Sequence, residues 1–417
     1  MAGDDDTWCP TIKKDWPNIS GKTVTMYSSI TGDEATALRK TMEDFNKCTG
    51  ATIKFNSDKN FEKQVVVQAR SGNPPDIAVV PQPGLLATLV STGAAVEAPA
   101  QVKDNVAKYW SKDWEGFGTV NGKFYAAPLG ANVKSLVWYS PKMFKDAGYE
   151  VPKTWDDMIA LSDKIAGAGD VKPWCAGIAS GDATGWPATD WLEEVVLRSA
   201  GPDVYDDWVA GKVKFTDPKI KTALDEVGSI LKNPKYVNAG WGDVSSIATT
   251  DFDKAGGPIL SGKCYMMQMA NFYTWPAGTK IGEDGDVYAF YEPPMGDQFG
   301  EPVEVGGEFI LGFNNNPATQ AVQFYLSTAH WANLQSIDSP SRISANKGLK
   351  VDNIQGAINK LSFEILMNPK SISRFDASDM MPAAVGAGAE WTQLTSWITG
   401  QDTDTTLQAI QAAWPAS

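Results

Sequence analysis

An alternation of strand and helix patterns near the start of the chain limits the possible folds more than any other feature. Strands are predicted where short runs are rich in β-branched or other apolar residues: Lys22–Ser28, Ala51–Phe55 and Asp76–Val80. Helices are predicted where apolar residues recur at helical spacing: Glu34–Lys47, Phe61–Ala69 and Leu85–Thr92. Because strand, helix and strand in succession form a parallel pair through a right-handed crossover, this order predicts a parallel sheet.

A second set of strand and helix patterns begins near Asn132. Its predicted strands are Trp174–Ala179, Cys264–Met269, Val287–Tyr291 and Glu308–Phe313. Its predicted helices are Trp155–Ile165, Asp190–Arg198, Asp217–Leu231, Pro317–Leu334, Ile354–Leu366, Glu390–Ile398 and Thr405–Trp414. Since 417 residues also exceed the usual size of one domain, we predict an α/β fold with two lobes, each a mainly parallel sheet flanked by helices.

The loops after the first three predicted strands are polar or rich in Pro and Gly. They are Ser28–Asp33, Asn56–Asn60 and Pro81–Gly84. In open parallel sheets, ligands bind beyond the carboxyl ends of the strands, where these loops lie. This edge is therefore the first place to expect a ligand.

Composition excludes several functions. The net charge of −14 disfavours a phosphate backbone as partner, so we expect no nucleic-acid binding. No apolar run approaches the roughly 20 residues that span a bilayer. The single histidine, His330, excludes any metal site that needs two imidazoles, and we predict neither a metal nor a cofactor.

Enzyme signatures are also missing from the sequence. There is no Gly-x-Ser-x-Gly elbow, no phosphate-binding loop, and no Gly-x-Gly-x-x-Gly after the first strand. A glycoside hydrolase or transglycosidase stays open as an alternative, since it needs only two carboxylates, such as Asp33 with Glu34 or Asp376 with Asp379. A carbohydrate-binding adhesin that does not serve a transporter is a further hypothesis, from a non-enzymatic class.

The chain has 16 Trp, more than core filling requires. We expect most of them to pack between helices and sheet. A half-exposed indole, however, is a rigid platform for the apolar face of a sugar ring. The tryptophan content therefore favours a carbohydrate ligand.

The four cysteines are too far apart for a Cys-x-x-Cys motif and allow three pairings. Cys9 precedes the first strand and Cys48 lies near the end of the first helix, whereas Cys175 and Cys264 lie in predicted strands. We predict the bonds Cys9–Cys48 and Cys175–Cys264, one in each lobe, because each pair lies in segments assigned to the same lobe. Four buried free thiols are the alternative. Two disulfides indicate an oxidising compartment, and the start of the chain then corresponds to a mature form.

Four stretches, in this order, resemble the extracellular solute-binding proteins of ABC sugar importers. The first is Gly50–Pro81, which contains the turn Gly72–Ile77. The second is Asn121–Asp157, with the segments Gly122–Pro128, Leu136–Ser140 and Pro152–Asp157. The others are Thr184–Trp191 and Phe375–Pro382, which look most like the α-glucoside-binding branch, related to maltose- and trehalose-type binders. The resemblance covers nearly the whole chain from Lys22 onward.

The resemblance implies a monomeric, non-enzymatic receptor that closes two lobes on a small carbohydrate and presents it to ABC permease subunits. It would work in the periplasm or at the cell surface, with or without a lipid anchor. The first lobe would comprise residues 20–130 and 305–365, the second 131–304 and 366–417, after an N-terminal arm of residues 1–19. Three crossing segments would form the hinge, where Gly130, Gly306 and Gly307 suit a dihedral change.

The family pattern also implies a set of ligand contacts in this sequence. These are Thr31, Asp33, Glu34, Asp58, Gln82, Asn132, Asp182, Trp186, Asn271, Gly306, Gly307 and Asp379. Trp186 is the expected stacking ring, since it precedes a proline and opens a helix; the alternative is a core Trp beneath that helix. Where many family members carry an aromatic residue, this chain has Pro81-Gln82-Pro83, so we expect no stacking there.

Overall fold

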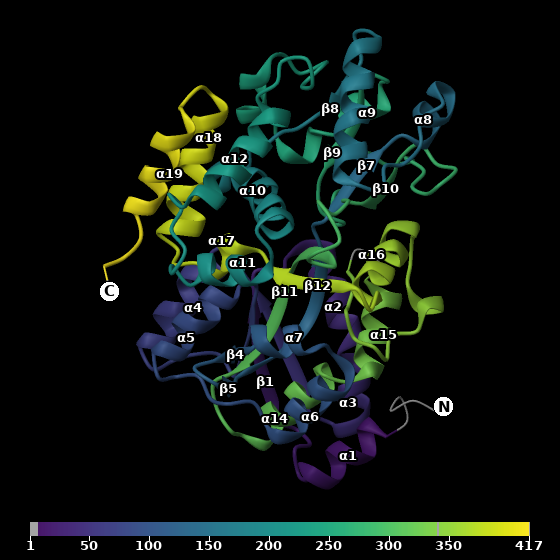
Figure 1. The fold of residues 1–417 in the computed structure, drawn as a ribbon. Coiled ribbons are helices and arrows are strands. Elements are labelled where there is room, and N and C mark those ends of the chain that lie inside the picture. The colour runs from purple at the N-terminus through teal and green to yellow at the C-terminus, as the bar shows by residue number, and fades with distance from the viewer. Residues whose placement is uncertain (1–6, 340–341, 417) are drawn as a thin grey trace. The chain divides into compact units, whose positions relative to one another are not determined.

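A computed structural model describes residues 7–339 and 342–416 of the chain. The chain divides into two compact units (Figure 1). Unit 1 comprises Met1–Asn132 and Gly306–Phe363, and unit 2 comprises Val133–Val305 and Glu364–Ser417. The chain therefore passes between the units at three places.

The sheet of unit 1 is built on the alternation that opens the sequence. β1 (Thr23–Ser28) pairs in parallel with both β2 (Thr52–Ser57) and β3 (Ile77–Val80), which confirms the predicted parallel arrangement. All four residues of β3 are buried, as expected for a strand covered on both faces. Phe309–Gly312, the second half of β11 (Glu301–Gly312), adds to β3 in the antiparallel sense. β6 (Ala126–Val133) pairs with β11, and β4 (Thr119–Val120) forms a small hairpin with β5 (Lys123–Phe124).

The helices of unit 1 lie before, between and after these strands along the chain (Figure 1). They are α1 (Trp8–Asp15), α2 (Gly32–Thr41), α3 (Glu43–Thr49), α4 (Phe61–Arg70), α5 (Pro83–Ser91), α6 (Ala100–Tyr109), α7 (Lys112–Phe117), α14 (Pro317–Leu326) and α15 (Ala329–Asp338). The short η5 (Val351–Asn353) follows, and α16 (Ala357–Met367) contains the last passage to unit 2.

Two long helices predicted from periodicity are each divided in the structure. Glu34–Lys47 is interrupted at Met42, where the Thr41 hydroxyl donates to the carbonyl of Leu38 at 2.6 Å and competes with the helical ladder. Pro317–Leu334 is interrupted before Thr328, whose hydroxyl caps α15 by accepting from the Trp331 amide. Apolar spacing continues across both breaks, so periodicity alone does not reveal them.

The sheet of unit 2 is mixed, so the prediction of a mainly parallel sheet is wrong for this unit. Its order is β10 (Tyr288–Tyr291), β7 (Leu136–Tyr139), β9 (Cys264–Gln268) and β8 (Lys172–Trp174). β7 pairs with β10 and β9 in the antiparallel sense, and only β8 with β9 is parallel. Several helices separate these strands along the chain, and a connection of that kind does not fix strand direction as a single crossover helix does. In the same unit, Glu301–Val305 of β11 pairs in parallel with β12 (Ser371–Phe375).

The extents of two predicted strands also require correction. The strand predicted over Trp174–Ala179 ends at Trp174, because the Ala176 amide donates to the Asn238 side chain rather than to a neighbouring strand. β11 begins at Glu301 instead of Glu308 and continues through Gly306 and Gly307. A Cβ on Gly307 would lie 2.3 Å from the Gly130 carbonyl oxygen, so glycine here permits a close backbone approach.

The helices of unit 2 include those predicted over Trp155–Ile165, Asp190–Arg198 and Asp217–Leu231. Over the described residues they are α8 (Pro141–Ala147), α9 (Trp155–Ala168), α10 (Trp186–Ser199), α11 (Pro202–Val209), α12 (Pro218–Leu231), α13 (Gly257–Leu260), α17 (Ala377–Met380), α18 (Trp391–Ile398) and α19 (Thr403–Ala412). Short η segments are η2 (Gly181–Ala183), η3 (Val244–Ala248), η4 (Phe252–Lys254) and the π-helical η6 (Val385–Glu390). Asp217 caps α12 by accepting from the Lys219 amide at 2.9 Å, with Pro218 in the first turn, as predicted.

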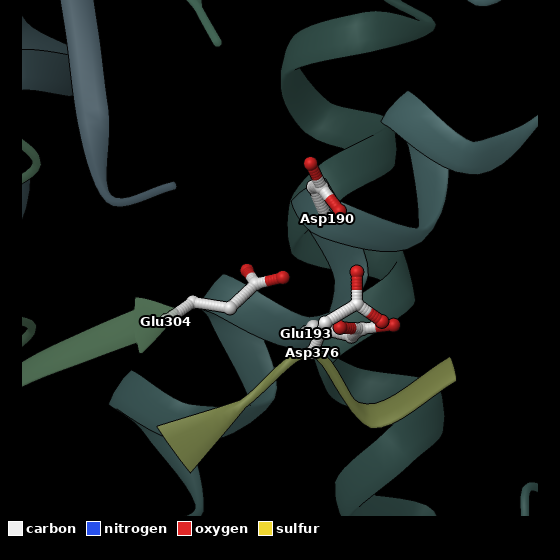
Figure 2. Close-up of side chains that lie close together, drawn as sticks. All are labelled: Asp190, Glu193, Glu304 and Asp376. Carbon is white, nitrogen blue, oxygen red and sulfur yellow. The ribbon is translucent and has the colours of Figure 1, made fainter. Parts of the chain in front are cut away.

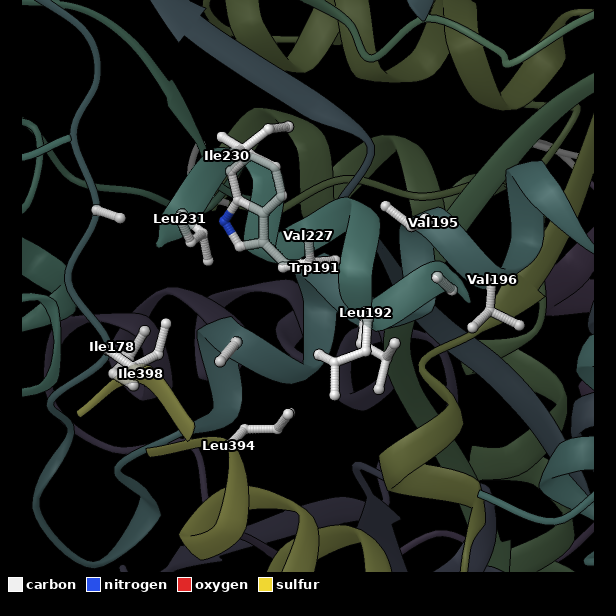
Figure 3. Packing of buried hydrophobic residues seen from close by; sticks show 14 of the residues in the cluster. Ile178, Trp191, Leu192, Val195, Val196, Val227, Ile230, Leu231, Leu394 and Ile398 are labelled. Carbon is white, nitrogen blue, oxygen red and sulfur yellow. The ribbon is translucent and has the colours of Figure 1, made fainter. Parts of the chain in front are cut away.

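α10 is the central helix of unit 2, buried from Pro187 to Arg198. Figure 3 shows apolar side chains of α10, α12 and α18 packed together, among them Trp191, Val227 and Leu394. Eleven of the 16 tryptophans are buried, which supports the expectation that most of them fill cores. Because α10 is buried all round, its acidic residues are buried as well, and they shape the site described below.

Both predicted disulfides are confirmed. Cys9–Cys48 joins α1 to α3 within unit 1, and Cys175–Cys264 joins the end of β8 to β9 within unit 2. Residues 1–6 of the predicted N-terminal arm lie outside the described residues. Over residues 7–339 and 342–416, no helix has the length and apolar character that crossing a membrane requires.

Candidate functional site

Polar residues of unit 1 follow the carboxyl ends of three adjacent strands. Thr31 is the N-cap residue of α2 after β1, and Gln82 is the N-cap residue of α5 after β3. Asp58 follows β2, and its amide donates to the Ser28 carbonyl at the end of β1. Asp33 is exposed in the first turn of α2. The structure therefore places these predicted contacts along one edge of the unit 1 sheet.

Glu34 is held by an arginine that the sequence did not single out. Arg342 donates to Glu34 and to Glu308 of β11, each at 2.5 Å, while its side chain is only 7% exposed. Burial opposes the charge on Arg342, but Glu308 and Glu34 outweigh it and raise the pKa of the guanidinium. Arg342 lies in a loop with no periodic pattern, so no local signal identifies it.

The predicted contacts on β6 and β11 can offer mainly backbone groups. Gly306 and Gly307 are buried within β11, and Asn132 is half-buried on β6. Gly130 and Gly307 touch through backbone atoms, since neither has a side chain to separate them. Of these residues, only Asn132 brings a polar side chain.

In unit 2, Trp186 is half-buried at the first position of α10. Its ring meets Phe252 with centroids 4.9 Å apart and Phe272 with centroids 5.9 Å apart. Phe272 is 37% exposed. Gly185 leads into this helix with a left-handed φ of 114°, where a Cβ would lie 2.3 Å from the Trp391 carbonyl oxygen. We refer to Trp186, Phe252 and Phe272 as the aromatic trio; the last two were missed from sequence, since they lie on irregular segments.

The ammonium of Lys134 lies beside this trio. It is 5.5 Å from the centroid of the Trp186 ring, and it donates to Asp190 at 2.8 Å and to Asp376. Glu193 of α10 and Glu304 of β11 complete the group, which we call the Lys134 cluster: Lys134, Asp190, Glu193, Glu304 and Asp376. Figure 2 shows the four carboxylates gathered from α10, β11 and the residue after β12; their ligand-type oxygens lie within 4.8 Å of one another.

One ammonium faces four buried carboxyl groups, so they cannot all ionise freely. Burial opposes ionisation of Asp376, but Lys134, Ser378 and the Asp379 amide outweigh it and lower the pKa of that carboxyl. Burial raises the pKa of Asp190 to about 7, against the attraction of Lys134. Burial likewise raises the pKa of Glu193 and of Glu304, and neither carboxylate oxygen of Glu304 has a hydrogen-bond partner among the described residues. Carboxylates in this number suit a cation, and the Lys134 ammonium supplies one.

Two further predicted contacts adjoin the Lys134 cluster. Asn271 is buried and accepts from the Val133 amide through its side-chain oxygen at 2.9 Å, while its NH₂ has no partner among the described residues. Asp379 is half-buried on α17, and its amide donates to Asp376 at 2.9 Å. Asp182, by contrast, is exposed on η2, just before α10. Residues 133–134 therefore connect three predicted contacts. Lys134 lies over the Trp186 ring, Val133 donates to Asn271, and Asp376 connects Lys134 to the amide of Asp379.

The carboxylate pairs proposed for a hydrolase are not arranged for acid–base chemistry. Asp376 is buried, bound to Lys134 and used to cap α17, and Glu34 is bound to Arg342. Asp33 remains exposed. A general acid needs a proton and an approach to the substrate, whereas Asp376 and Glu34 each accept hydrogen bonds from a buried cation.

Comparison with known proteins shows the family. The chain matches the bacterial extracellular solute-binding protein family over residues 28–328, and it belongs to that family. It is 37% identical to the alpha-glucosides-binding periplasmic protein AglE of Rhizobium meliloti (strain 1021), over 95% of this chain and 88% of that relative. It is 33% identical to the osmoprotective compounds-binding protein GgtB of Synechocystis sp., over 96% and 95% of the two chains. The fold is similar to that of the bacterial solute receptor AcbH, with TM-score 0.80, 19% identity and coverage of 94% and 98%.

These relatives are receptors, so the prediction of a non-enzymatic binding protein is confirmed and the hydrolase alternative is unsupported. The α/β fold class is confirmed by the same likeness, which extends over nearly the full chain. The family is extracellular by description, in agreement with the two disulfides.

Proposed function

We propose that this protein is the substrate-binding component of an ABC importer and captures an α-glucoside or a small oligosaccharide of the maltose, trehalose or sucrose type. The observation that carries the proposal is the aromatic trio, a half-exposed apolar surface beside polar groups. The C–H face of a pyranose fits an indole ring, and its hydroxyls need donors and acceptors around the rim. The name of the relative AglE supports the α-glucoside class.

The polar groups of both units suit a neutral polyol. Unit 1 offers Asp33, Asp58 and Gln82 as charged and amide partners at its sheet edge. Unit 2 offers the NH₂ of Asn271, which is buried without a partner among the described residues and would donate to the oxygen of a sugar hydroxyl. We propose that residues of both units contact one sugar, and that the three segments passing between the units act as a hinge.

Under this proposal the protein works as a monomer outside the cytoplasmic membrane, with or without a lipid anchor, and delivers its ligand to permease subunits. The support is the family description and the two disulfides. Permease genes beside its own gene are expected for an importer and not for an adhesin.

Titration calorimetry with maltose, trehalose and sucrose, followed by chromatography of each mixture, tests the proposal. We expect one sugar bound per chain, with heat of binding and no product. Galactose serves as the comparison, since the receptor AcbH, which shares the fold, has an exclusive substrate preference for β-D-galactopyranose. Release of a cleaved sugar, or binding of none of the α-glucosides, would contradict the proposal.

A further inference from the structure

The Lys134 cluster has a role that the ligand contacts above leave unexplained. We propose that Lys134 is a positioning residue of the sugar site: without touching sugar, its buried ammonium fixes the ring of Trp186 and, through Asp376, the turn that carries Asp379. This inference rests on the proposed function. It concerns how the half of the site in unit 2 is held in place before a ligand arrives.

The first step is the geometry of α10. Trp186 and Asp190 are four residues apart, so their side chains lie on one face of the helix, one turn after the other. The Lys134 ammonium lies between them, 2.8 Å from Asp190 and 5.5 Å from the Trp186 centroid. A cation over an indole is attracted by the ring quadrupole, and the attraction grows where water is excluded. Lys134 is 7% exposed, so it meets that condition.

The second step is the link to Asp379. Asp376 accepts from Lys134 with one carboxylate oxygen, and with the other from the Ser378 hydroxyl at 2.7 Å and the Asp379 amide at 2.9 Å. Glu193 of α10 accepts from the amides of Ala377 and Ser378. The first turn of α17 is therefore held by two carboxylates, one of which is anchored on Lys134.

The third step is that Lys134 is itself fixed along the backbone. Its amide donates to the Glu304 carbonyl at 2.9 Å, and the neighbouring Val133 amide donates to Asn271. Ser135 donates to Glu194 and accepts from the Glu304 amide. A side chain rooted in so restrained a segment can hold its partners in one place, which is what preorganisation of a binding site requires.

Lys134 differs from a ligand contact because protein groups already bind its ammonium. Asp190 and Asp376 take two of its hydrogens, and the Trp186 ring covers a further side. With both carboxylates bound, Lys134 has little capacity for a sugar hydroxyl. Its effect on affinity must therefore pass through Trp186 and Asp379.

The test combines calorimetry with ¹⁹F NMR of protein labelled with 5-fluorotryptophan. The Trp186 resonance is identified by its loss in Trp186→Phe. We expect Lys134→Met to shift that resonance in the sugar-free protein and to weaken binding of the best sugar of the panel at least tenfold. Lys134→Arg keeps the positive charge and should recover most of the affinity.

A matched control is available in the same unit. Lys232 lies 4.8 Å from the ring of Trp397, which makes it a cation over an indole outside the proposed site. Lys232→Met should leave both the affinity and the Trp186 resonance unchanged. If Lys134→Met does not fold, Asp190→Asn keeps the ammonium, removes one ionic anchor and should shift the resonance and the affinity in the same direction.

The outcomes separate the inference from the proposed function. A wild-type protein that binds none of the sugars overturns the proposed function. A wild-type protein that binds, with an unmoved Trp186 resonance and unchanged affinity in a folded Lys134 variant, overturns the inference alone. Equal weakening by Lys134→Met in the wild-type and Trp186→Ala backgrounds would overturn the claim that Lys134 acts through the Trp186 ring.

Discussion

At the scale of single residues, the proposed site depends on a few side chains whose neighbours are buried. Trp186 owes its position to Gly185 before it, to Phe252 and Phe272 beside it, and to Lys134 over its ring. Glu34 owes its position to Arg342. In both units a buried cation holds a residue that the family pattern assigns to the ligand.

Replacing Trp186 by alanine should weaken sugar binding by about 2 kcal/mol, or roughly 30-fold, because a large rigid contact is lost. Calorimetry on the folded variant measures the change. Trp414→Ala is the matched control, since Trp414 is another half-buried indole of unit 2 and packs against Gly211 rather than against the trio. Equal affinity of the Trp186→Ala variant and the wild type would remove Trp186 from the site.

The titration of Asp190 should make stability depend on pH. Its pKa is about 7 in the folded protein and 3.8 when unperturbed, so the folded state binds the proton more tightly. The unfolded state therefore loses the proton first as pH rises, and the free energy of unfolding should fall by about 1.4 kcal/mol per pH unit between about pH 4 and pH 7 from this group.

Urea unfolding at a series of pH values measures that slope. Asp190→Asn carries no titrating proton and should give a shallower slope, while Asp253→Asn, on the surface of unit 2, should not. Glu193 and Glu304 have their pKa values raised in the same direction, so some slope should persist in Asp190→Asn. Identical slopes in Asp190→Asn and wild type would show that this carboxyl does not titrate in that range.

At the scale of elements, the sequence predicts most helices and strands, and its failures have identifiable physical causes. α12 was predicted with its cap, because Asp217 and Pro218 are local signals. α10 begins at Trp186, as expected for a tryptophan followed by a proline, although the periodic pattern predicted the helix only from Asp190. The strand predicted from Glu308 begins earlier in β11, because Gly306 and Gly307 continue it and Gly307 permits a close approach to Gly130 of β6.

The candidate site likewise contains residues that the sequence predicted and residues that it did not. The loops that carry Asp33, Asp58 and Gln82 were predicted because strand order fixes where they meet, while the choice of these residues came from the family resemblance. Lys134 and Arg342 were not, because their partners lie far away in the sequence and form no spacing pattern. The carboxylates of α10 also gave no signal of their shared burial, since a helix buried all round does not show one polar face.

Each disulfide should stabilise the unit that contains it. Removing Cys175–Cys264 by double serine substitution should destabilise unit 2 by about 2–4 kcal/mol, because the bond closes a long loop in the unfolded chain. Removing Cys9–Cys48 should have a similar effect on unit 1 and spare unit 2. Scanning calorimetry with hydrogen exchange assigns each effect to a unit. Loss of protection in the opposite unit alone would contradict this assignment.

At the scale of the whole molecule, three passages of the chain join two α/β units, and the proposed ligand contacts are divided between them. Neither unit alone provides both the aromatic trio and the acidic groups after β1 and β2. If one sugar must contact both the aromatic trio and the acidic groups, the bound sugar stabilises the arrangement of the units in which both can contact it. Binding then raises the population of that arrangement.

Small-angle scattering with and without a saturating sugar measures whether one ligand brings the two units together. We predict a smaller radius of gyration in the sugar-bound protein, with no change on adding a sugar that calorimetry shows not to bind. The Trp186→Ala variant at the same sugar concentration should show a smaller fraction of the change. An identical radius of gyration for the free and saturated wild-type protein would contradict the claim that binding draws the two units together on one ligand.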